Sequence, residues 1–124
     1  MNEIPSHMNY LQEMRSQALV KFKENISNVQ ALVVLSSISE DSDSFRDDII
    51  KCLKGAILYF LEYLALSVND YNKEEINAFK EALIKLFDDV NVYASNLTYP
   101  EISDICYRLT KTINLINESD KSRS

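Results

Sequence analysis

Apolar side chains are densest in residues 49–68, a stretch that holds a single acidic residue, Glu62. Placed on a helix at ~100° per residue, these side chains cover an arc of roughly 220°. A surface helix of a globular protein needs an apolar stripe of only about 100°. The pattern therefore predicts a helix, over residues 45–68, that other elements cover on at least two sides.

Three further segments show the 3.6-residue period of an amphipathic helix. The first, residues 7–37, keeps one apolar phase through the weak helix formers at 25–28, so we expect one helix, the longest of the four, either straight or bent near Asn25. The next segment is predicted as the third helix of the chain, over 73–96, with Asn72 as its cap. The last is predicted as the fourth helix, over 99–117, where Thr98, Pro100 and Glu101 form a capping box with proline in the first turn.

Glycine occurs once and proline twice in the 124 residues. Because a sheet needs several turns, and turns draw on these two residues, this composition favours few, long elements. Short connections place sequential helices antiparallel, so the fold class predicted is all-α, an up-down four-helix bundle. We expect residues 1–117 to form a single domain with a frayed start at 1–5, and the polar residues 118–124 to form a disordered tail.

The net charge is −6, and the 13 basic residues are scattered among 19 acidic ones. Nucleic-acid-binding proteins normally carry a basic face, so we expect no nucleic-acid partner. No apolar run reaches the ~20 residues that a membrane span requires, and the start of the chain does not have the pattern of a secretory signal. A cytoplasmic protein is expected, in which Cys52 and Cys106 are reduced thiols of the core.

The sequence lacks the residues that most catalytic mechanisms require. His7 is the only histidine, which argues against nucleophile–histidine pairs, histidine-rich zinc sites and the arginine-to-histidine spacing of helical ribonucleases. The single glycine lies inside a predicted helix, so a phosphate-binding loop is excluded. Asp41 and Asp43 resemble the opening of a calcium loop, but the later ligand positions do not match. We therefore expect no enzyme, no cofactor and no metal site.

Several residues fit a binding surface better than a core. Arg15 interrupts the apolar stripe of the first helix. Its side chain either extends outward so that the guanidinium group reaches water, or pairs with an acid across an interface. The chain has seven tyrosines and no tryptophan, and tyrosine suits surfaces that are covered part of the time. The acids near the start of the second helix could steer a basic partner, or simply be solvated. The candidate interaction residues are Arg15, Leu58, Tyr59, Glu62, Tyr63, Glu40, Asp41 and Asp43.

The leading hypothesis is a non-catalytic protein–protein interaction module that binds a protein partner, and the acidic segment favours a basic one. We expect a homodimer through the first two helices, because self-association would cover the wide apolar arc. Immunity proteins, toxin inhibitors and small regulators share this size and charge. The alternative is a ligand-binding or enzymatic helical domain with a pocket near Gly55, Tyr59 and Glu62. Gly55 itself is interpreted either as a point of close helix approach or as an adjustable backbone in a groove.

Overall fold

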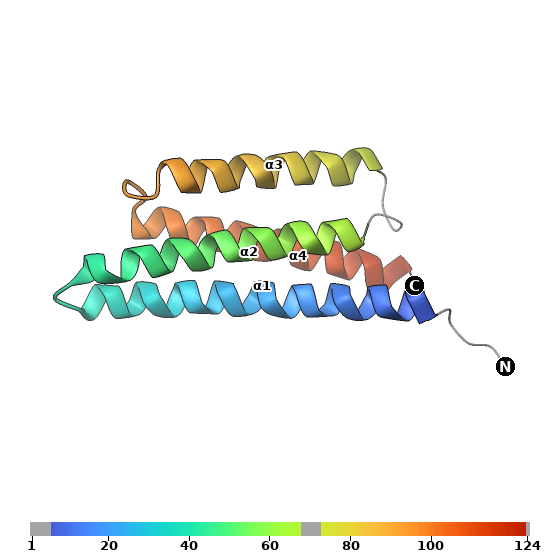
Figure 1. The fold of residues 1–124 in the computed structure, drawn as a ribbon, viewed down its shortest axis with the longest axis horizontal. Coiled ribbons are helices and arrows are strands. Elements are labelled where there is room, and N and C mark those ends of the chain that lie inside the picture. Colours follow the sequence, from blue (N-terminus) through green and yellow to red (C-terminus); the bar gives the residue numbers. More distant parts are fainter. Residues whose placement is uncertain (1–5, 68–72, 124) are drawn as a thin grey trace.

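The structure, a computed structural model, describes residues 6–67 and 73–123, with the side chains of 10–41, 43–67 and 73–118. It contains four α-helices, α1 (Ser6–Ile38), α2 (Arg46–Leu66), α3 (Lys73–Val92) and α4 (Tyr99–Arg123), with a short 3-10 helix η1 (Ser42–Phe45) before α2. Figure 1 shows that sequential helices run antiparallel. The prediction of an all-α, up-down four-helix bundle is confirmed.

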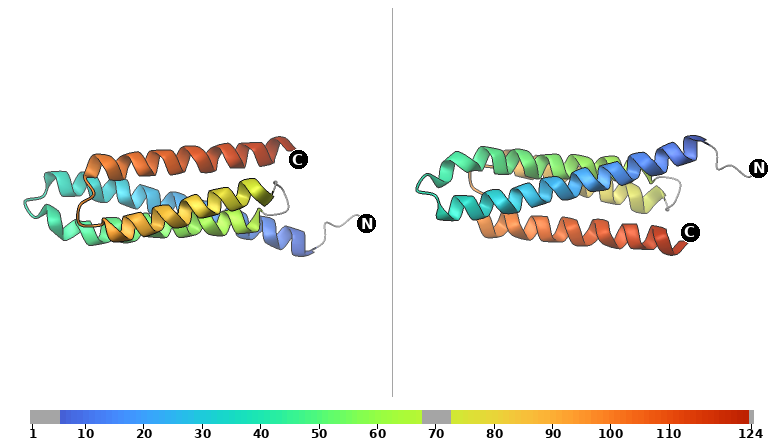
Figure 2. Two further views of the ribbon diagram at one scale, coloured as in Figure 1. Left: turned by 90° about the horizontal axis from the view of Figure 1, so that it is seen from above. Right: turned by 90° about the horizontal axis from the view of Figure 1, so that it is seen from below.

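Helix α1 is the longest, with 33 residues, and it continues without a break through residues 25–28. At 1.5 Å per residue it is ~50 Å long. Its N-terminal end extends past α2 and α3 (Figure 2). The prediction of one continuous first helix is therefore confirmed, because burial of its apolar face outweighs the weak local helix propensity.

Two predicted boundaries were wrong. The third helix ends at Val92 instead of residue 96, and the turn after it is closed by the Leu97 amide donating to the Tyr93 carbonyl at 3.0 Å. Helix α4 continues past residue 117 to Arg123, so the segment expected as a disordered tail is helical up to that residue. An established helix adds each further residue at little cost when neither glycine nor proline intervenes. The predictions for residues 1–5 and for the Asn72 cap lie outside the described residues.

The N-terminus of α4 has the predicted capping box. The Glu101 amide donates to Thr98 Oγ1 at 3.3 Å, and the Thr98 amide donates to Glu101 Oε1 at 3.3 Å. The Thr98 hydroxyl also donates to the same carboxylate oxygen at 2.8 Å. Two backbone donors at the helix start are thus satisfied reciprocally.

Helix α2 forms the centre of the core. Its inward residues include Leu53, Ile57 and Phe60, and the Phe60 ring meets Phe22 of α1 edge to face with centroids 5.6 Å apart. Among the described large apolar side chains of α2, only Leu58 is exposed, at 52%. The chain's own helices therefore cover most of the wide apolar arc, and a dimer is not needed for that purpose.

The four helices do not contact one another equally. Helix α2 approaches α1, α3 and α4, and α4 also approaches α1. Between the described parts of α3 and α4, in contrast, no pair of Cα atoms comes within 8 Å. The bundle is therefore more open along the α3–α4 side than elsewhere. None of the described helices combines the length and apolar character that crossing a bilayer requires.

Gly55 allows α1 and α2 to approach closely. A Cβ atom at this position would lie 3.0 Å from Asn25 Oδ1 and 3.3 Å from Asn25 Cγ. The Asn25 amide is oriented by donating from Nδ2 to the Lys21 carbonyl at 3.0 Å. The interpretation of Gly55 as a point of close helix approach is thus confirmed.

We expect Gly55→Ala to gain clearly less than the ~1 kcal/mol that this change yields in an open helix interior, because the new methyl group presses on Asn25. In an Asn25→Ala background the obstacle is gone, and the same change should stabilise the protein by about 1 kcal/mol. The measurement is the free energy of unfolding in urea for the four proteins of this cycle. Equal effects in both backgrounds would show that Asn25 does not limit the approach.

Candidate functional site

A groove of about 370 Å³ runs between α3 and α4, with Phe60 of α2 at its floor. Phe60 is only 1% exposed, whereas Phe79 on the α3 wall is 39% exposed. The walls follow the helical period, so that lining residues recur every three or four positions on each helix. The lining residues are Phe60, Phe79, Ala82, Leu83, Leu86, Asp104, Ile105, Arg108, Leu109 and Thr112.

The polar groups of the groove belong to the α4 wall. Arg108 Nε lies 3.0 Å from Asp104 Oδ2, and both side chains are largely exposed. This pair is one helical turn apart on the same helix, an arrangement worth only a few tenths of a kcal/mol. The apolar residues therefore define the groove, and the ion pair places one neutralised pair of charges at its edge.

At the end of the bundle where α4 begins, a polar cluster links α4 and the connection before it to α1 and α2. Arg46 Nη1 donates to the carbonyls of Ala94 at 3.1 Å and Leu97 at 2.8 Å, and the guanidinium carbon lies 5.5 Å from the centre of the Tyr99 ring. The hydroxyl of Ser36, a buried residue of α1, donates to the Tyr99 hydroxyl oxygen. The start of α2 is thereby joined to the α3–α4 connection, and α4 is joined to α1.

A second cluster fastens α4 near its other end. The Tyr63 hydroxyl of α2 donates to Asn117 Oδ1 of α4 at 3.3 Å. The Arg15 guanidinium carbon lies 5.8 Å from the centre of the Tyr63 ring, and Arg15 Nη1 is 3.5 Å from Ser67 Oγ. The Ser67 hydroxyl in turn donates to the Tyr63 carbonyl at 2.8 Å. Helix α4 is therefore held against α1 and α2 at two points along its length.

Two of the candidate interaction residues are not surface groups. Tyr63 is 1% exposed, so its prediction as a partly exposed aromatic was wrong. Its hydroxyl reaches Asn117, which satisfies the polar end of an otherwise buried ring. Arg15 is half-buried over that ring instead of reaching outward. Both residues belong to the cluster that holds α4.

A second hollow, of about 570 Å³, lies between α1 and α2 and corresponds in part to the predicted pocket. Gly55 and Tyr59 line it together with Asn25, Asn28, Ala31, Leu32, Asp48, Lys51 and Cys52, whereas Glu62 is not among the lining residues. Lys21 Nζ lies 5.5 Å from the centre of the Tyr59 ring. This hollow is more open than the groove between α3 and α4, and its lining is more polar.

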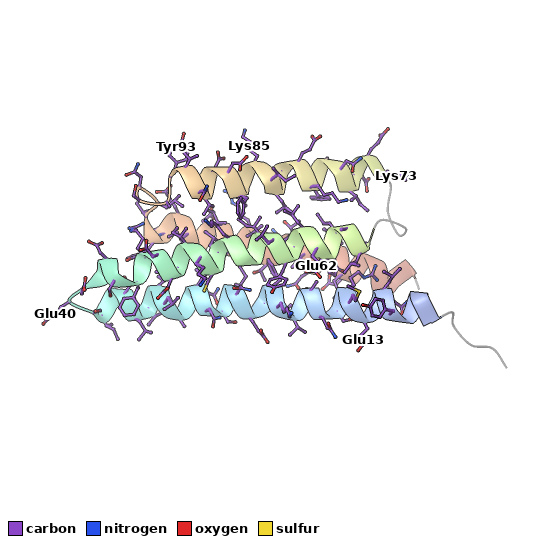
Figure 3. The ribbon with its side chains drawn as sticks, viewed as in Figure 1. Glu13, Glu40, Glu62, Lys73, Lys85 and Tyr93 are labelled. Carbon is purple, nitrogen blue, oxygen red and sulfur yellow. The ribbon has the colours of Figure 1, made fainter. Side chains whose placement is uncertain are left out.

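The remaining candidates lie on separate surfaces. Leu58 and Glu62 are exposed on α2. Glu40, Asp41 and Asp43 are exposed where α1 turns toward α2, at the end of the bundle marked by Glu40 in Figure 3. The structure thus distributes the eight residues over the α4-holding cluster, the α1–α2 surface and the acidic turn, and it brings none of them into the α3–α4 groove.

Sequence reasoning missed both the groove and Arg46. The spacing of apolar residues in α3 predicts an amphipathic helix, but periodicity alone does not show that Phe79 remains partly exposed. Arg46 did carry a signal, because a cation in the first turn of a helix is unfavourable to the helix dipole. Such a residue indicates a compensating tertiary partner, here the carbonyls of Ala94 and Leu97.

The two thiols are free and protected. Burial raises the pKa of Cys106 to about 11. Burial also raises the pKa of the half-buried Cys52, and the Asp48 carboxylate adds to this, against a smaller lowering by Lys51. A raised pKa keeps a thiol protonated and poorly nucleophilic near neutral pH. Within the described residues, His, Cys, Asp and Glu side chains form no group of three that could hold a metal ion.

We expect Arg46→Met to lower the free energy of unfolding by about 1–3 kcal/mol, because two carbonyls lose a charged donor while the apolar stem is retained. Arg108→Met is the matched control, and the loss of its exposed ion pair should cost no more than about 0.5 kcal/mol. Urea unfolding measures both values, and hydrogen exchange at the Leu97 amide should accelerate only in the Arg46 variant. Equal stabilities of the two variants would contradict the role given to Arg46.

The two cysteines should differ in reactivity toward Ellman's reagent at pH 8. Cys52 is partly accessible, so we expect it to react at least about tenfold faster than the fully buried Cys106. The rate at Cys106 should continue to rise toward pH 11, since its thiolate forms only there. Cys52→Ala and Cys106→Ala variants assign each rate, and full reactivity of both thiols in urea is the control. Similar rates in the folded protein would mean that α4 is not packed as described.

Comparison with family models, with curated proteins and with solved structures gives no match to this chain. The interpretation of its surfaces therefore rests on their own geometry. Of these surfaces, the α3–α4 groove has the most continuous apolar lining and a core aromatic at its floor.

Proposed function

We propose that this chain is a non-catalytic protein–protein interaction module whose binding surface is the groove between α3 and α4. The observation that carries the proposal is an apolar groove with two helical walls and Phe60 at its floor. Apolar side chains that remain accessible along such a groove gain free energy when a partner removes them from water. Grooves between helices are a recurrent site for docking another protein's helix.

The same surface is better suited to binding than to chemistry. Its charged groups, Asp104 and Arg108, neutralise each other and are largely exposed to solvent. Catalysis by side chains relies on groups whose pKa values are shifted in a water-poor site. The groove offers instead a row of aliphatic and aromatic contacts, which suits burial of a partner's apolar side chains.

Within this class, we favour a regulatory or inhibitory binding protein, comparable in size and acidity to immunity proteins and antitoxins. A net charge of −6 supports electrostatic attraction to a basic partner. Self-association through α1 and α2 has less support, because α2 is covered within one chain. The exposed apolar residues that such a dimer could still use include Val34, Leu35 and Ile38 near the end of α1.

Filling the groove should abolish partner binding while the fold is kept. Ala82 lines the groove and is exposed, so Ala82→Trp places a bulky ring in the groove without enlarging a core side chain. We expect a protein that co-purifies with the wild-type chain from its own cell to be reduced at least about tenfold, since a blocked central contact typically costs 2 kcal/mol or more.

Ala65→Trp, at an exposed position of α2 outside the groove, is the matched control and should retain the partner. Circular dichroism and urea unfolding establish that both variants are folded. If Ala82→Trp retains the same partner in the same amount, the groove is not the binding surface. If a small molecule instead of a protein co-purifies and stabilises the chain, the proposed function is wrong.

A further inference from the structure

We propose that the α3–α4 groove receives a basic amphipathic helix from the partner protein, about two turns of which contact the groove. This inference rests on the proposed function and specifies the partner's chemistry. Three properties of the groove support it: its length, the absence of free backbone groups along its walls, and the charges at its edges.

The length of the groove matches two helical turns. On α3 the lining residues extend from Phe79 to Leu86, and on α4 from Asp104 to Thr112. At 1.5 Å per residue these segments are ~11 Å and ~12 Å long, about two turns each. An occupying helix would therefore present apolar side chains at positions i, i+3 or i+4, and i+7.

The walls favour a helix over an extended peptide. Both walls are helices whose central backbone groups are already hydrogen-bonded within the helix, so they offer no edge to which a strand could pair. An extended peptide would bring its own backbone N–H and C=O groups onto an apolar wall without partners, which is costly. A helix satisfies these groups internally and presents only side chains.

The charges at the edges favour a basic helix. Glu75 lies one turn before Phe79, Glu101 lies one turn before Ile105, and Asp89 lies one turn after Leu86. All three acids are exposed on the faces of α3 and α4 that bear the lining residues. The charge of Asp104 is already neutralised by Arg108.

The nearest other cations differ in position. On a wheel of ~100° per residue, Lys85 is rotated away from the lining residues of α3, whereas Lys111, seven residues after Asp104, lies at the edge of the α4 wall. Figure 3 shows Lys85 on the outer side of α3. Because Glu75, Asp89 and Glu101 outnumber Lys111, the edges carry a net negative charge, which complements lysine or arginine flanking the apolar stripe of a partner helix.

Two synthetic peptides test the inference with the full-length protein. Both contain about 14 residues with the same leucine stripe at i, i+4, i+7 and i+11, and they differ only in flanking lysines or glutamates. We expect the lysine peptide to bind at least about tenfold more tightly, with a difference that shrinks as salt screens the charges. Fluorescence anisotropy gives the affinities, and amide chemical shifts should change along α3 and α4.

Charge-reversed variants locate the effect. The double variant Glu75→Lys with Asp89→Lys should remove the preference for the lysine peptide. The matched control is Glu81→Lys with Asp88→Lys, which makes the same change on the outer face of α3 and should leave the preference intact. Ala82→Trp should weaken the lysine peptide at least about tenfold, whereas Ala65→Trp should not.

Equal affinity for the two peptides, shifts confined to other helices, or no binding at millimolar peptide would overturn the inference. If the peptides fail but the native partner is still lost on Ala82→Trp, the proposed function stands and only the basic helix is wrong. If sedimentation shows a wild-type dimer that Ala82→Trp dissociates, the occupant is a second copy of the chain, which also overturns the inference.

Discussion

Burial of α2 is the constraint on which the rest of the structure depends. Its apolar arc is too wide for one neighbour, and α1, α3 and α4 each approach a different part of it. Helix α1 comes close to α2 at Gly55, where the missing side chain leaves room for Asn25. Among the described residues, α2 is the only helix whose backbone comes close to that of α3, and it also approaches α4, so α3 and α4 need not approach each other as closely. The groove between them is therefore a consequence of the same wide arc that organises the core.

Two arginine–tyrosine pairs keep α4 in place. In each pair the guanidinium covers a tyrosine ring, and the tyrosine hydroxyl is hydrogen-bonded to a different helix, through Ser36 for Tyr99 and through Asn117 for Tyr63. Tyrosine suits this position since its ring packs as a core residue while its hydroxyl still finds a partner. Both anchors join α4 to α1 or α2. The polar contacts thus hold one wall of the groove independently of the other.

The sequence was sufficient for what depends on periodicity and local chemistry. It predicted four helices, the unbroken first helix, the close approach at Gly55 and the capping box at Thr98. It did not predict the burial of side chains whose exposure depends on which neighbouring helix covers that face of their own helix. The spacing of Tyr63 shows that it lies on the flank of α2, but not that α4 covers this flank. Similarly, the stripe of α3 shows an apolar face, while the exposure of Phe79 depends on the distance to α4.

The two walls of the groove are supported in different ways. Among the described parts of the helices, α3 approaches only α2 closely, whereas α4 approaches both α1 and α2. Lys54 of α2 reinforces the α3 contact by donating to Asn91 Oδ1 at 3.0 Å, at an exposed position. The contact of α3 with α2 is nevertheless the more extensive one, and α4 depends in addition on the polar contacts of Tyr99 and Tyr63. The two walls are therefore supported by different interactions: α3 by close packing on a single helix, and α4 by packing on two helices together with two polar clusters.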